Sequence, residues 1–133
     1  MNAALWAFGG MVLLATMGAG GGAEANSPAY DKCIDRSEGV TSAMRDCAGV
    51  ESSRQDRELN AIYKQAMASR DTAGREQLRA QERAWLKTRD AHCKLSAQPD
   101  AEGTLGLIEA DDCWIDLTDK RITALRALAG GRP

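Results

Sequence analysis

Four cysteines are the residues of this sequence whose chemistry is easiest to anticipate. An even number of cysteines in a short chain from an oxidising compartment is typical of disulfide bonds. A zinc site would need ligands at closer spacing, and the sequence has no Cys-x-x-Cys pair. We therefore expect two disulfides, with no metal and no cofactor, among Cys33, Cys47, Cys93 and Cys113.

The remaining residues do not form a recognisable catalytic arrangement. The single histidine, His92, adjoins Cys93, and neighbouring side chains on a helix point about 100° apart, so His92 is badly placed to activate that thiol. The sequence contains no Ser/His/Asp arrangement and no glycine loop that would bind phosphate. Calcium binding by Asp111, Asp112 and Asp116 does not fit the spacing of a twelve-residue calcium loop. We predict that the protein is not an enzyme.

An acidic segment is the most distinctive charge pattern. Between Ser96 and Asp119 there is no Lys or Arg, and the acidic residues there are Asp100, Glu102, Glu109, Asp111, Asp112, Asp116 and Asp119. One interpretation is a patch that steers a basic protein partner toward this chain. The other is the solvated start of a helix, where acidic groups complement the helix dipole. The sequence leaves both interpretations open.

A second candidate surface lies before the third cysteine. Gln81, Trp85 and Arg89 follow one another at intervals of four residues and share a helix face, with Asp90 beside them. Trp and Arg are frequent anchors of protein interfaces, so the stripe is a candidate recognition site. Alternatively, Trp85 fills the core and Arg89 pairs with an acidic residue of a neighbouring helix.

The elements that would position these residues are helices. After residue 25 the sequence has sixteen Ala and nine Leu but only two Val. We expect two short helices within Ser27–Cys47, broken near Gly39, with Ser27-Pro28 at the start and Thr41 as a possible cap. A break at 71–74 separates the next two helices, and the predicted ranges are about 50–70, 75–95 and 108–129. Short connections make the fold all-α, a compact antiparallel bundle of about four helices stapled by two disulfides.

Sequential pairing of the cysteines, Cys33 with Cys47 and Cys93 with Cys113, is the connectivity that we favour. A continuous helix of fourteen or twenty residues spans about 21 or 30 Å, whereas bridged Cα atoms lie about 4.4–6.8 Å apart. Each pair must therefore enclose a chain reversal. The Ser37-Glu38-Gly39 stretch supplies one reversal and the stretch from Gln98-Pro99-Asp100 to Gly103 supplies the other.

The first 25 residues differ from the rest of the chain. An apolar stretch from Trp6 to Met17 is followed by glycines and Ala23-Glu24-Ala25, which resembles a signal-peptidase site. We expect residues 1–25 to be a signal peptide and residues 26–133 to form one exported domain, periplasmic or secreted, without a membrane span. That domain has 17 Lys and Arg against 18 Asp and Glu, since Glu24 is lost, and this near-neutral balance argues against nucleic-acid binding.

A family resemblance is carried by three ordered motifs. Thr41-Ser42-Ala43-Met44-Arg45-Asp46-Cys47 follows the first cysteine, and Leu59-Asn60-Ala61-Ile62-Tyr63 comes next. The third is the run from Gln81 through Trp85-Leu86, Arg89-Asp90 and Cys93, followed by Cys113 and Thr118-Asp119-Lys120-Arg121. Over residues 30–128 the chain resembles the bacterial exported domain family named after the lysozyme inhibitor LprI.

That resemblance implies a small helical, disulfide-bonded envelope protein that binds and occludes a host or competitor muramidase. Animal lysozymes are generally basic, which would suit the acidic segment. The 96–107 connection, held at both ends by disulfide cysteines, is our candidate for the part that covers the cleft. The alternative is an envelope interaction or stress module that binds another protein without inhibiting lysozyme.

Overall fold

The structure is a computed structural model that describes residues 26–96 and 103–130. These two ranges contain four helices, which in chain order are α1 (Pro28–Arg36), α2 (Thr41–Ala68), α3 (Thr72–Ser96) and α4 (Leu105–Gly130). No strand occurs in these two described ranges. The predicted all-α fold with about four helices is therefore confirmed.

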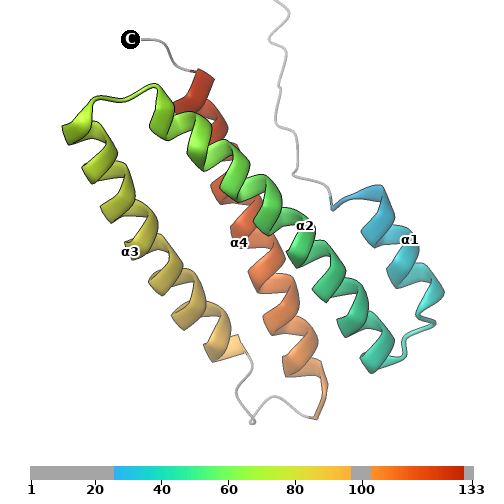
Figure 1. Ribbon diagram of the computed structural model, residues 1–133. Helices are drawn as coiled ribbons and strands as arrows, with labels where there is room; N and C mark the ends of the chain where they lie inside the picture. Colours follow the sequence, from blue (N-terminus) through green and yellow to red (C-terminus); the bar gives the residue numbers. More distant parts are fainter. Residues whose placement is uncertain (1–25, 97–102, 131–133) are drawn as a thin grey trace, which may run out of the picture.

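The helices are arranged around one central pair. α2 packs most extensively on α4, α3 lies against α4, and α1 lies against the first half of α2 (Figure 1). α2 and α3 touch each other only sparsely although a short turn joins them. One side of the α2–α4 pair is thus covered by α1 and the other by α3.

The start of α1 follows from local chemistry. The Ser27 hydroxyl accepts a hydrogen bond from the Tyr30 amide at 3.1 Å, and Pro28 occupies the first helical position. Glu38 and Gly39, with φ of 48° and 76°, then turn the chain. Both torsions lie in the left-handed region, which is why a glycine suits the second position.

The boundaries of three predicted helices were wrong. The helix expected from Val50 begins at Thr41, because no residue between the α1–α2 turn and Val50 stops it. Thr41 is its first helical residue, and Val40 takes the cap position without a side-chain hydrogen bond. α3 starts at Thr72 instead of Arg75, since the Asp71 carboxylate accepts from the Gly74 amide at 2.8 Å and caps that end. α4 begins at Leu105, three residues before the predicted start.

Two clusters of buried side chains form the core. The larger joins α2, α3 and α4 through Leu59, Ala66, Leu78, Ile122 and Leu125. The smaller joins α1, α2 and α4 through Tyr30, Cys47, Ala48 and Ile115. Residues that the helical periodicity predicted as inward, such as Leu59, Leu78 and Ile122, are buried here.

The disulfides have the predicted sequential connectivity. Cys33 pairs with Cys47 and Cys93 with Cys113, at Cα separations of 5.7 and 5.5 Å, and no cysteine is free. The first bond joins α1 to α2 and the second joins α3 to α4. Cys47 lies near the start of α2, Cys113 near the start of α4 and Cys93 near the end of α3, and these three helix ends lie at the same end of the bundle (Figure 1).

Two expectations concern residues outside the described ranges. The predicted signal peptide, residues 1–25, lies outside them, as does half of the 96–107 connection, whose residues 97–102 are not described. Of the helices that are described, none combines the length and the hydrophobicity needed to cross a bilayer.

Candidate partner-binding surface

Arg89 is the most deeply buried member of the predicted recognition stripe. Only 4% of the residue is exposed, and its Nη1 donates a hydrogen bond to the Thr118 hydroxyl of α4 at 3.2 Å. Its guanidinium carbon lies 3.3 Å from the centroid of the Trp114 ring and 4.9 Å from that of Trp85. The acidic partner is Asp90, the next residue on the same helix, at 3.0 Å. Arg89 thus ties α3 to α4 through Thr118 and Trp114.

The other residues of the stripe are more exposed than Arg89. Trp85 is half-buried against the larger core cluster, whereas Gln81 and Asp90 are exposed. Arg121 of α4 also lies over the Trp85 ring, with its guanidinium carbon 5.6 Å from the ring centroid, and pairs with Glu82 of α3 at 2.6 Å. The face that Gln81, Trp85 and Arg89 share therefore packs inward at Arg89 and reaches solvent at Gln81.

The described acidic residues of α4 do not form one continuous patch. Asp111 pairs with Arg45 of α2 at 2.9 Å, and Asp112 accepts a hydrogen bond from the Tyr30 hydroxyl of α1 at 3.2 Å. Asp116 is exposed and pairs with Lys120 on its own helix at 2.7 Å. Successive residues of a helix point in different directions, so a run that is continuous in sequence is distributed around α4.

One hollow nevertheless brings two predicted site residues together. Asp90 of α3 and Asp111 of α4 both line an open hollow of about 400 Å³, where Asp56 of α2 joins them. The ring of Trp114 contributes an apolar wall, and Lys94 is the one cation in the lining. Three carboxylates beside an indole ring suit the side chain of a lysine or arginine from a protein partner.

A second acidic hollow was missed by the sequence analysis. Asp31 and Asp35 of α1 line it together with Asp112 of α4, and Tyr30 lies among them. Burial and the neighbouring Asp112 carboxylate raise the pKa of Tyr30 to about 12. The i, i+4 spacing of Asp31 and Asp35 placed them on one helix face, but nothing in the sequence showed that this face lies beside α4.

A buried polar network at the start of α1 was also missed. The Glu51 carboxylate accepts hydrogen bonds from the Ser27 hydroxyl at 2.7 Å and from Arg54 Nη2 at 2.7 Å. Burial alone would raise the pKa of Glu51, but these hydrogen bonds outweigh it and hold the pKa below its ordinary value. Gln55, one turn on, donates from Nε2 to the Ile115 carbonyl at 3.0 Å. These contacts fasten α1 and α4 to α2.

Within the described residues, no group of three or more His, Cys, Asp or Glu side chains is arranged so that it could hold a metal ion. A family model described as lysozyme inhibitor LprI matches residues 33–125. The chain belongs to the LprI lysozyme inhibitor family. The matched residues include all four cysteines, the stripe on α3 and the hollow lined by Asp56, Asp90 and Asp111. They also include the second acidic hollow, apart from Asp31 and the lining residues before it. No curated protein and no solved structure matches this chain.

Proposed function

We propose that this protein is exported, binds a muramidase and blocks its cleft. The family match over residues 33–125 is the observation that carries the proposal. Two disulfides in a small helical domain also suit a protein of an oxidising compartment. A muramidase places two carboxyl groups on either side of the scissile sugar bond, so an inhibitor acts by covering them.

The hollow lined by Asp56, Asp90 and Asp111 is our candidate contact for a basic enzyme surface. Its carboxylates come from three helices, which fixes their spacing before the partner arrives. Asp90 and Asp111 already hold Arg89 and Arg45, whereas the exposed Asp56 makes no ion pair with another described residue. A lysine or arginine of the enzyme would therefore be attracted most strongly to Asp56 and would stack against Trp114.

The experiment is a cell-wall turbidity assay with chicken-type, goose-type and invertebrate-type lysozymes and increasing amounts of the oxidised protein. We expect protection against at least one enzyme near equimolar ratio and loss of protection after reduction. Absence of protection against all three classes would overturn the proposal and favour an interaction module with another envelope partner.

Charge reversal tests the contact separately. Asp56→Lys should weaken inhibition at least tenfold and reduce its salt dependence, because a like charge would then face the basic partner. Glu76→Lys is the matched control, since Glu76 is an exposed acid of α3 that does not line the hollow. Equal inhibition by wild type and Asp56→Lys would refute the contact while leaving inhibition itself standing.

A further inference from the structure

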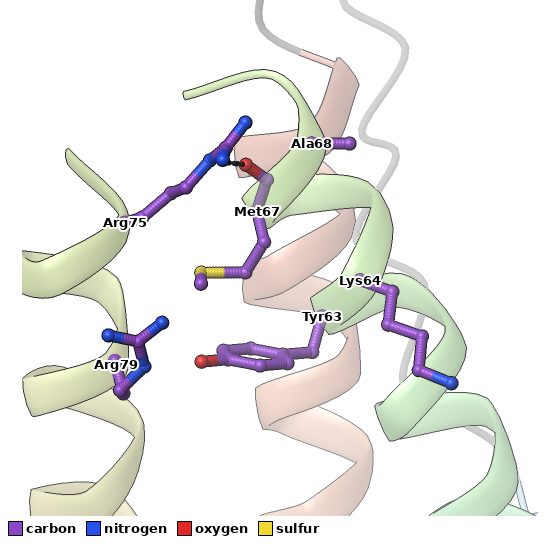
Figure 2. Close-up of a pocket in the computed structure, with 6 residues that line it drawn as sticks. All are labelled: Tyr63, Lys64, Met67, Ala68, Arg75 and Arg79. Carbon is purple, nitrogen blue, oxygen red and sulfur yellow. Dashed lines mark hydrogen bonds between the residues drawn. The ribbon is translucent and has the colours of Figure 1, made fainter. Parts of the chain in front are cut away.

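A third hollow lies between α2 and α3, close to the turn that joins them. Its volume is about 430 Å³. Tyr63 and Met67 point from α2 toward α3, while Arg75 and Arg79 reach back from α3 (Figure 2). Lys64 and Ala68 complete the lining on the outer side of α2.

The floor of this hollow is apolar and well supported. Tyr63 and Met67 are partly buried and pack on the larger core cluster, so their outer surfaces remain accessible above it. The sparse contact between α2 and α3 leaves this surface uncovered by the neighbouring helix. An apolar floor of this kind favours the alkyl or aryl part of a ligand.

The charged groups around this floor are all cations. Arg75 donates from Nε to the Met67 carbonyl at 3.1 Å, which holds its guanidinium at the edge and leaves both terminal nitrogens for another acceptor. Arg79 lines the same hollow as Tyr63 (Figure 2), and no hydrogen bond or ion pair joins its guanidinium to another described side chain. No acidic residue lines the hollow.

Two guanidinium groups above an apolar floor match one class of ligand. A carboxylate accepts paired hydrogen bonds from a guanidinium, and an attached apolar chain gains from contact with Tyr63 and Met67. We propose that this pocket binds an apolar chain that ends in a carboxylate, with Arg75 and Arg79 on the carboxylate. The pocket lies at the α2–α3 turn, apart from the acidic hollow of the proposed muramidase contact, and so constitutes a second binding site.

Isothermal titration calorimetry with octanoate tests this site on the oxidised protein. We expect 1:1 binding, at least tenfold weaker binding of octylammonium and 1-octanol, and at least a tenfold loss of octanoate affinity in Arg79→Gln. Arg83→Gln is the matched control, because Arg83 is exposed on the same helix and does not line the pocket. Its affinity for octanoate should equal that of the wild type.

Two sources share this ligand chemistry, an acyl chain and the apolar carboxyl terminus of a peptide. To distinguish them, the affinity for the peptide Ala-Ala-Leu, with a free carboxylate and as its C-terminal amide, is compared with the affinity for octanoate. Tighter binding of the free peptide than of octanoate identifies a chain terminus, and the reverse identifies an acyl carboxylate. Octanoate binding that is absent at millimolar concentration, equal to that of octylammonium, or unchanged by Arg79→Gln would overturn the proposal, whatever the outcome of the lysozyme assay.

Discussion

Replacement of Arg89 by alanine is the perturbation that best separates a structural from a recognition role on α3. The side chain is 4% exposed and contacts Thr118 and Trp114 of α4. If these contacts are its main role, Arg89→Ala should lower the free energy of unfolding, and any loss of partner binding should follow from that loss of stability.

The magnitude can be built from the contacts. A buried hydrogen bond from a charged donor contributes about 1.5–3 kcal/mol, and a desolvated cation over an indole ring about 2 kcal/mol. The Asp90 pair adds less than about 1 kcal/mol, because 55% of the Asp90 side chain is exposed. Removal of the charge also removes the cost of burying it, which offsets part of the sum. We expect Arg89→Ala to destabilise the protein by about 3 kcal/mol.

Urea denaturation of the oxidised protein, followed by circular dichroism at 222 nm, measures this change, with Arg83→Ala as the exposed control on the same helix. The control should lie within about 0.5 kcal/mol of the wild type. A loss below about 1 kcal/mol for Arg89→Ala would refute the structural role. If such a stable variant also failed to inhibit lysozyme, the recognition interpretation of the stripe would be correct.

Three further predictions concern stability. Replacing Cys33 and Cys47 together by serine should lower the free energy of unfolding by about 3 kcal/mol, because the disulfide no longer restricts the unfolded chain. Thermal unfolding measures the change, and a melting temperature equal to that of the wild type would contradict it. Leu125→Ala, at a fully buried core position, should lower the free energy of unfolding by about 3 kcal/mol in urea denaturation. The control Leu128→Ala, on the exposed side of α4, should lower it by less than half as much. Equal losses in the two variants would argue against the described core. The pKa of Glu51 lies below its ordinary value of 4.5, so the stability that its carboxylate adds should be complete at neutral pH and be lost as the pH falls below 4.5 through the folded-state pKa. Glu51→Gln should flatten that part of the pH dependence of stability, and an equally steep acid limb would disprove the assignment.

Much of the fold follows from local features of the sequence. The Ser27-Pro28 pair marks the start of α1 correctly. The sequential cysteine pairing that we favoured, for which the sequence supplies a reversal inside each pair, is the observed connectivity. The errors lie at helix starts, where the Asp71 cap of α3 was missed and a break was predicted before Val50 that α2 does not have. Gly49, near the predicted start of the second helix, is simply an exposed helical residue of α2.

The candidate site was less predictable, because it depends on how helices rotate against each other. The sequence shows that Asp111 and Asp112 are adjacent, but only packing reveals that one faces α2 and α3 while the other faces α1. In the same way, nothing in the sequence around Asp56 indicates a binding residue. It becomes a candidate for partner binding only because the fold places it in the same hollow as Asp90. Arg89 was predicted either to recognise a partner or to pair with an acidic residue of a neighbouring helix. Its actual partners, Thr118 of α4 and Asp90 of its own helix, could be identified only from the structure.

The connectivity of the disulfides divides the molecule into two covalently closed hairpins, α1–α2 and α3–α4. The turn at Ser69–Asp71 is the single covalent link between them, while their largest interface, between α2 and α4, is entirely non-covalent. A protease that cuts this turn would therefore release two oxidised halves that can reassociate. An uncut chain that opens there can also exchange hairpins with a second copy and form a swapped dimer without breaking either disulfide.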